Sequence, residues 1–276
     1  MIIKADLHTH TIFSDGTLTP QELIDLAIKK NIRILSITDH DSVEGIDLAI
    51  NYAENLNIEI IPGIELSTDI NGTEVHILAY FIDYKNPELL EYIENFHTER
   101  MERAKKIIAK LNNLGLEISL NDVKKIAKNA PICRPHIAKA LYNLGQIKNI
   151  KQAYIKYIGD YGPANVRKEH ISTKSLLNLI NNAGGLSFIA HPGFMKEEII
   201  KELISLGIDG IETVHSTHKP FQVKHYKGIV NEYFLLESGG SDFHGGDRND
   251  DSNFGKFLVS ETIVRAMKKR LNIFTS

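Results

Sequence analysis

Short apolar segments alternate with helical segments in both halves of this 276-residue chain, and this alternation limits the possible folds more than any other feature. The expected strands are residues 2–7, 32–38, 58–66, 75–82, 186–190, 210–214 and 234–238. Thr19-Pro20-Gln21-Glu22 is typical of a helix start, with a cap residue, an early proline and an acid in the first turn. Strands separated by helices usually pair in parallel through right-handed crossovers. Seven such strands without a dinucleotide-binding glycine motif favour an α/β fold closed into a barrel.

The segment 85–171 interrupts this alternation, because it shows a helical apolar period and no strand pattern. We therefore expect a barrel built from residues 1–84 and 172–276, with a helical insertion over 85–171. Residues 85–174 hold 17 Lys/Arg and 9 Asp/Glu, whereas the rest of the chain holds 15 and 26. This asymmetry suggests a metal site in the acidic body and an anion-binding surface on the insertion. The alternative is that most of these lysines are solvated helix positions.

The overall composition is that of a soluble globular protein, with 42% hydrophobic and 24% charged residues. The single cysteine, Cys133, allows no disulfide framework and no multi-cysteine metal site, and we expect it to be a small buried residue. No apolar run is long enough to span a bilayer, and the N-terminus lacks a signal-peptide pattern. A cytoplasmic protein without membrane partners is therefore expected. The net charge of −3 also argues against stable duplex DNA binding.

Residues that can bind metal gather where the expected strands end. His8 and His10 are two residues apart on one strand, so their imidazoles point to the same side. The remaining candidates follow later strands or lie in nearby segments: Asp15, His40, Glu65, His76, His191, Asp242 and His244. Barrels of this kind carry their chemistry at the carboxyl ends of the strands, so we expect these side chains to converge. Their mixture of nitrogen and oxygen atoms suits manganese, iron(II) or zinc better than magnesium.

Six motifs spread over nearly the whole chain resemble those of the PHP (polymerase and histidinol phosphatase) superfamily. They are Asp6-Leu7-His8-Thr9-His10, Ser14-Asp15-Gly16, Thr38-Asp39-His40-Asp41, Gly63-Ile64-Glu65, Ala190-His191-Pro192 and Ser241-Asp242-Phe243-His244. The insertion segment Arg134-Pro135-His136-Ile137-Ala138 is similar to the branch that contains 3′,5′-nucleoside bisphosphate phosphatases and a 5′-to-3′ exoribonuclease. The resemblance implies a distorted seven-stranded β/α barrel that binds two or three divalent ions, with manganese the first choice.

The resemblance also implies how the ions share their ligands. The first ion would take His8, His10, Glu65 and Asp242, the second Glu65, His76 and His191, and the third Asp15, His40 and His244. All nine positions of the family pattern are present, as expected of a catalytic member.

The expected function is metal-dependent hydrolysis of a nucleotide phosphate ester, in a 3′,5′-nucleoside bisphosphate or at the 5′ end of short RNA. A metal-activated water would be the nucleophile, so no protein nucleophile is required. Arg134 and His136 are the predicted substrate-binding residues, because a guanidinium can bind a phosphate through two parallel hydrogen bonds. The alternative is that Arg134 pairs with a carboxylate and His136 begins a helix. Arg100 and Arg103 are weaker candidates for the same role.

Several residues and functions stay open on the sequence alone. Asp6, Asp39 and Asp41 could orient ligands or only support the backbone. No ligand motif includes the other histidines, which we expect to be surface or packing residues: His97, His170, His215, His218 and His225. The alternative functions are a histidinol-phosphate phosphatase, a metal-dependent amide hydrolase, and a non-catalytic metal-binding PHP module.

Overall fold

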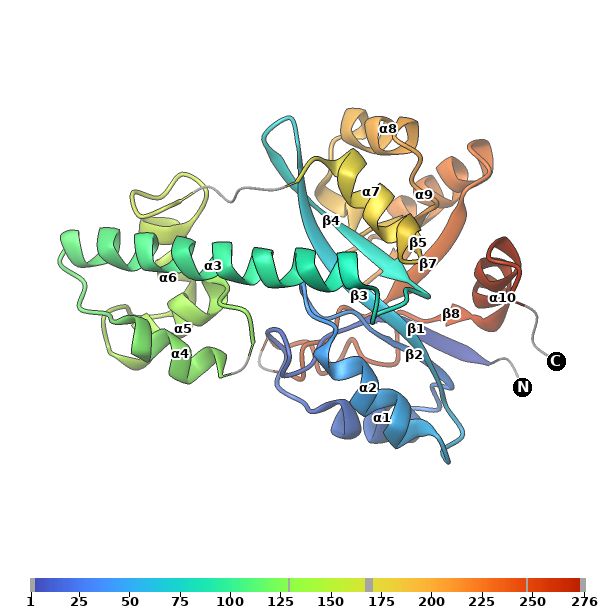
Figure 1. Ribbon diagram of the computed structural model, residues 1–276, viewed down its shortest axis with the longest axis horizontal. Coiled ribbons are helices and arrows are strands. Elements are labelled where there is room, and N and C mark those ends of the chain that lie inside the picture. The colour runs from blue at the N-terminus through green and yellow to red at the C-terminus, as the bar shows by residue number, and fades with distance from the viewer. Residues whose placement is uncertain (1–2, 129, 167–170, 247, 274–276) are drawn as a thin grey trace. The chain divides into compact units, whose positions relative to one another are not determined.

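The structure is a computed structural model that describes residues 3–128, 130–166, 171–246 and 248–273 (Figure 1). The chain divides into two compact units. The first contains Met1–Leu90 and His170–Ser276, and the second contains Glu91–Glu169. In the described part of the chain, no helix has the length and apolar character needed to cross a membrane.

The first unit is built around one eight-stranded sheet in the order β7-β6-β5-β4-β3-β2-β1-β8. Its strands are β1 (Lys4–Thr9), β2 (Ile34–Ile37), β3 (Glu59–Ile70), β4 (Thr73–Tyr80), β5 (Leu186–Ile189), β6 (Gly210–His215), β7 (Leu236–Gly240) and β8 (Val259–Ser260). Beyond β7, the Asp242 N–H donates to the His8 carbonyl at 2.9 Å, and the His10 N–H donates to the Phe243 carbonyl at 2.9 Å. These bonds bring the β7 side of the sheet back to β1 and nearly close it. The predicted distorted barrel is confirmed.

Strand β4 departs from the prediction that all strands pair in parallel. It runs antiparallel to both β3 and β5. The reason is the two-residue connection between β3 and β4, since so short a link can only form a hairpin. Asn71 and Gly72 have φ angles of 51° and 81°, the left-handed values that a tight hairpin turn requires. The Asp69 carboxylate also accepts a hydrogen bond from the Gly72 N–H at 2.8 Å.

The C-terminal segment adds two elements that were not predicted from the sequence. Strand β8 pairs antiparallel with β1 through Ala5 and Val259. Helix α10 (Glu261–Arg270) follows at once, with an acid in its first turn and basic residues in its last turn. That charge order is favourable to the helix dipole, and it could have predicted this helix from the sequence.

The other helices of the first unit are α1 (Pro20–Lys29), α2 (Glu44–Ala53), α7 (Thr173–Asn182), α8 (Glu197–Ser205) and α9 (Pro220–Glu232). Helix α1 begins at the predicted signal, because the Thr19 hydroxyl accepts from the Glu22 N–H while the Glu22 carboxylate accepts from the Thr19 N–H. The strands enclose fully buried side chains such as Leu7, Tyr80 and Phe188, and the last two rings meet edge to face at 5.1 Å. This core fixes the strands whose ends carry the candidate ligands.

The second unit is helical. It contains most of α3 (Pro87–Asn113), then α4 (Leu120–Ala127), α5 (Arg134–Asn143), α6 (Ile150–Ala153) and a π-helical turn, Tyr154–Ile158. Its own hydrophobic core includes Leu111, Val123, Ile137 and Leu141. Cys133 is buried, as the composition suggested.

Candidate metal centre

The nine predicted ligands come from different strands and lie together in the first unit. His8 lies next to the last residue of β1 and His10 just beyond the strand, while Glu65 lies in β3 and His76 in β4. His40, His191, Asp242 and His244 follow β2, β5 and β7, and Asp15 lies in the loop before α1. Glu65, predicted to end its strand, and His76 both lie inside their strands, because β3 and β4 extend into a long hairpin beyond the predicted ends. His76 pairs with Ser67, two residues beyond Glu65, and this register puts His76 diagonally across from Glu65.

Glu65 is the centre of the arrangement, since its fully buried carboxylate faces five imidazoles. Its Oε1 atom lies 2.8 Å from His76 Nδ1 and 2.9 Å from His191 Nε2. Its Oε2 atom lies 3.0 Å from His40 Nδ1 and 3.4 Å from the Nε2 atoms of His8 and His10. One carboxylate that touches so many imidazoles is suited to bridge two cations.

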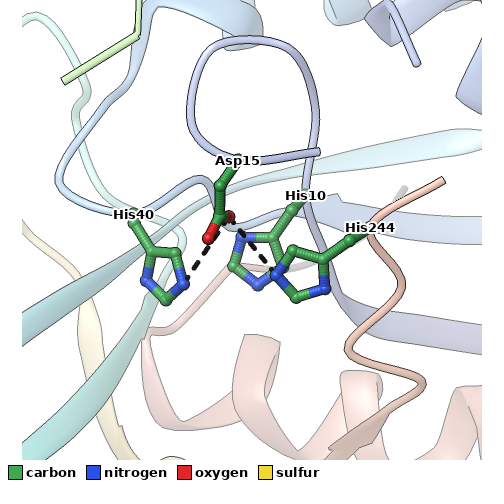
Figure 2. A group of neighbouring side chains, drawn as sticks. All are labelled: His10, Asp15, His40 and His244. Carbon is green, nitrogen blue, oxygen red and sulfur yellow. Dashed lines mark ion pairs between the residues drawn. The ribbon is translucent and has the colours of Figure 1, made fainter. Parts of the chain in front are cut away.

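Two further carboxylates complete the cluster. Asp242 Oδ1 lies 3.0 Å from His10 Nε2 and 3.3 Å from His8 Nε2. Figure 2 shows Asp15 directed between His40 and His244, with His10 beside them. Asp15 Oδ1 is 3.8 Å from His40 Nε2 and 3.3 Å from His244 Nε2. The ligand atoms of His10, Asp15, His40 and His244 all lie within 4.8 Å of one another.

The cluster fits metal ions better than it fits a set of ordinary hydrogen bonds. Asp15 Oδ1 and His244 Nε2 are buried and face each other at 3.3 Å, yet neither makes a hydrogen bond of ordinary geometry with any residue that the structure describes. Buried polar atoms are costly without partners, and a cation would provide one for both. The donor set of imidazole nitrogens and carboxylate oxygens is also one that manganese, iron(II) or zinc accepts.

The electrostatics keep the acids charged and one key imidazole neutral. Burial alone would raise the pKa of Glu65, but His40, His76 and His8 outweigh it and hold that pKa well below its usual range. Asp15 and Asp242 are held low in the same way by their histidine neighbours. Burial, followed by the charges of His244 and His40, lowers the pKa of His10 to about 3. His10 therefore keeps a free lone pair at neutral pH.

Metal binding is expected to strengthen as the pH rises toward about 9. Burial would lower the pKa of His76, but Glu65 and Glu74 outweigh it and raise the pKa to about 9. An ion that uses this imidazole must displace its proton, so His76 should contribute a rise in affinity of about tenfold per pH unit that levels off near pH 9. Nearby carboxylates also raise the pKa values of His8 and His244, so these ligands should add to the pH dependence. Electron paramagnetic resonance of free manganese at each pH would measure this. An affinity that does not change with pH would contradict the use of His76 as a ligand.

The aspartates left open by the sequence support the backbone around the cluster. Asp6 accepts hydrogen bonds from the N–H groups of Ser241 and His8, and burial raises its pKa to about 7. Asp39 accepts from the Thr11 N–H and from the Thr11 and Ser14 hydroxyls at 2.5–2.7 Å, which holds the loop that carries Asp15. Asp41 accepts from the Ser67 N–H at 3.2 Å. These contacts go to backbone and hydroxyl groups and not to ligand imidazoles.

Three residues at the cluster were not identified from the sequence. Glu212 is buried against His8, and Arg248 forms an ion pair with Asp15. His215, expected to be a surface or packing residue, is buried with its Nε2 atom 3.4 Å from Asp242 Oδ2. A charged residue inside the apolar strand 210–214 was the one signal that could have pointed to Glu212.

The other histidines without a ligand motif do not contact any of the three ligand carboxylates in the contacts described for them. His218 is buried and contacts the Thr213 carbonyl through Nδ1, and His225 is exposed on α9. His97 is half-buried on α3. His170 lies outside the described residues.

The predicted substrate-binding residues have local partners in the second unit. Arg134 Nη1 lies 2.6 Å from Asp160 Oδ1, and His136 Nδ1 accepts from the Cys133 N–H at the start of α5. Arg100, which is buried, donates to Cys133 Sγ, and Arg103 donates to the Val166 carbonyl at 2.6 Å. These are the contacts of the alternative interpretation, and a substrate role for Arg134 and His136 stays a prediction.

Known proteins share both the sequence and the fold. The PHP domain model matches residues 6–169. A 5′-3′ exoribonuclease from Haemophilus influenzae is 32% identical over 250 residues, which are 88% of this chain and 91% of that protein. A 3′,5′-nucleoside bisphosphate phosphatase from Chromobacterium violaceum is 31% identical over 87% of this chain and 86% of its own length.

A solved structure agrees with these matches. A proposed metal-dependent phosphoesterase from Bifidobacterium adolescentis superposes with a TM-score of 0.88 at 29% identity, and the match covers 96% of both chains. The family predicted from the six motifs is therefore confirmed by sequence and by structure. The chain belongs to the PHP domain family, with the fold and the clustered histidines and carboxylates expected of its metal-dependent phosphoesterases.

Proposed function

We propose that this chain is a metal-dependent phosphoesterase that hydrolyses a nucleotide phosphate ester, in a 3′,5′-nucleoside bisphosphate or at the 5′ end of short RNA. The observation that carries the proposal is the convergence of six imidazoles on three carboxylates, with Glu65 within 3.4 Å of five of those rings. The relatives named above act on substrates of these two kinds. We propose two or three divalent ions, with manganese as the first choice and iron or zinc as alternatives.

Bound ions would supply charge for the phosphate oxygens, a more acidic water and stabilisation of the leaving oxygen. The protein's own part is to hold the ligands in place. Glu65 connects the side of the cluster that contains His76 and His191 to the side that contains His8 and His10. The backbone hydrogen bonds from Asp242 and His10 keep β1 and the segment after β7 together while the substrate binds.

The basic residues of the insertion favour a substrate that carries a second phosphate. The insertion holds an excess of basic residues, and Arg134 pairs with Asp160, whose side chain is 78% exposed. The Arg134 side chain is 22% exposed and also donates to the Ile158 carbonyl, but an ion pair with so exposed a carboxylate contributes only about 0–1 kcal/mol, so a phosphate could replace Asp160 at little cost. We propose that Arg134, together with His136, recognises the phosphate that is not cleaved.

Metal-stripped protein reloaded with manganese provides the direct test. It should release phosphate from adenosine 3′,5′-bisphosphate or nucleotides from short 5′-phosphorylated RNA, and act more slowly on histidinol phosphate and on an amide substrate. Turnover of histidinol phosphate alone would favour the small-molecule phosphatase. Tight manganese binding without turnover of any substrate would favour the non-catalytic module.

Replacing Arg134 with alanine is expected to raise KM for the bisphosphate by roughly 10–100-fold, the equivalent of one charge-assisted hydrogen bond. The KM for a generic aryl phosphate, which has no second phosphate, should stay nearly unchanged. Arg265→Ala is the matched control, because Arg265 also forms an exposed pair, with Glu261 on α10. Steady-state kinetics of both variants on both substrates would decide, and equal effects on the two substrates would remove Arg134 from substrate recognition.

A further inference from the structure

Strand β6 contributes no predicted ligand, yet two of its buried side chains lie against the cluster of predicted ligands. It lies between β5 and β7 in the sheet, so it is next to the strands that precede His191 and Asp242. Glu212 is fully buried and His215 is 2% exposed. A buried carboxylate is costly unless all its oxygens have partners, and this one has two.

The two Glu212 oxygens contact two different predicted ligands. Oε1 lies 2.9 Å from His8 Nδ1, and Oε2 accepts a hydrogen bond from the His191 N–H at 2.7 Å. A carboxylate oxygen can only accept, so when a cation takes the place of the proton on His8 Nε2, the remaining proton is held on Nδ1 by Glu212. His8 Nε2 faces Glu65 and Asp242 at 3.4 and 3.3 Å, so it lies on the side of the ring where a cation would bind.

The hydrogen bond to the His191 backbone supports an unusual conformation. His191 has φ and ψ angles of 29° and 57°, in the left-handed region that residues with a side chain rarely adopt. The following residue is Pro192, which restricts the backbone of His191 further. Such a conformation persists only where the surroundings hold it, and it directs the His191 ring to Glu65 at 2.9 Å.

His215 has the opposite role from a metal ligand. Its Nδ1 atom accepts from the Thr217 N–H at 3.2 Å, so a neutral ring carries its proton on Nε2. His215 Nε2 lies 3.4 Å from Asp242 Oδ2, within ion-pair distance but outside hydrogen-bond geometry, while Asp242 Oδ1 faces His8 and His10. This tautomer places the His215 N–H next to the Asp242 carboxylate, where a small shift would allow it to donate.

We propose that Glu212 is a positioning residue of the metal centre, which fixes the metal-facing nitrogen of His8 and the backbone of His191 at the same time. His215 assists by holding Asp242. The inference rests on the proposed metal-dependent function, but it concerns metal affinity and ring tautomer and not the identity of the substrate. Ligand histidines commonly donate their second nitrogen to a carboxylate in this way.

The test compares Glu212→Gln with Glu237→Gln, a matched change on β7 whose carboxylate contacts Thr213 and Lys227. Glutamine keeps the shape, but its NH₂ group must face one of the two donors. Manganese affinity, measured by electron paramagnetic resonance, should fall by about 10–100-fold in E212Q and stay unchanged in E237Q. Long-range proton–nitrogen spectra of the proteins loaded with diamagnetic zinc should show His8 with its proton on Nδ1 in the wild type and a mixture of ring states in E212Q.

The outcomes separate the inference from the proposed function. An E212Q affinity within about twofold of wild type, or an unchanged His8 tautomer, would overturn the inference. Wild-type protein that binds manganese but hydrolyses none of the phosphate esters would refute the function, while a loss of affinity in E212Q would still support the role of Glu212. Circular dichroism of both variants would show that each is folded, and Glu212→Asp, which keeps the charge, should recover part of the affinity.

Discussion

Replacing Glu65 with glutamine is expected to lower kcat by roughly 10³-fold or more, even at saturating manganese. Glu65 is the carboxylate that His8, His10, His40, His76 and His191 all approach. An amide has almost the same shape but no charge, so the change removes the bridge between the two sides of the cluster. The loss amounts to several kcal/mol of transition-state stabilisation, which metal ions typically provide.

Glu59→Gln is the control for this change, because Glu59 lies on the same strand at its other end. Its carboxylate is partly exposed and pairs with Lys268 at 2.6 Å, away from the cluster. The E59Q protein should keep wild-type kcat and its full number of bound manganese ions. Activity and metal stoichiometry, measured on dialysed samples of both variants, provide the comparison. If E65Q kept activity within about tenfold of wild type, Glu65 would not be the bridging ligand.

The candidate ligands could be found from the sequence because their chemistry contrasts with their surroundings. Histidines and acids next to short apolar strands are rarely explained by packing, and parallel strands bring their carboxyl ends together. His76 shows the limit of this reasoning. It reaches the cluster from an antiparallel strand, and the orientation of β4 follows from the Asn71-Gly72 turn, which the sequence already contained.

Other residues could not be predicted because their partners are distant in the sequence. Glu212 and His8 are 204 residues apart, and Arg248 and Asp15 are 233 residues apart. The loop that carries Arg248 has no periodic pattern to place it. Arg134 pairs with Asp160, 26 residues further along the chain. A guanidinium binds a carboxylate and a phosphate equally well, so the sequence around Arg134 does not show which of the two is its partner. Contacts of this kind depend on the three-dimensional path of the chain.

The second large effect is expected at Gly240, the residue where β7 meets β1. A Cβ atom on Gly240 would lie 2.4 Å from the backbone nitrogen and the Cβ of His8, closer than non-bonded atoms can approach. Gly240→Ala must therefore displace either β7 or the backbone that carries the His8 imidazole. Overpacking of this kind typically costs about 1–3 kcal/mol of folding free energy. Manganese affinity should fall together with stability, because the displaced residue is a predicted ligand.

Gly228→Ala separates this steric effect from the general effect of adding a methyl group. Gly228 lies within α9, and a Cβ at that position would have no neighbour within 4 Å. Alanine is the better helix former by about 1 kcal/mol, so this variant should be as stable as wild type or more stable. Urea unfolding midpoints and manganese affinities of the two variants would show opposite changes in stability and a loss of affinity only in G240A. Both substitutions add one methyl group. If G228A lost as much stability and manganese affinity as G240A, the loss would not come from the close approach of β7 to His8. That result would contradict the closure of the sheet that brings Asp242 and His10 together.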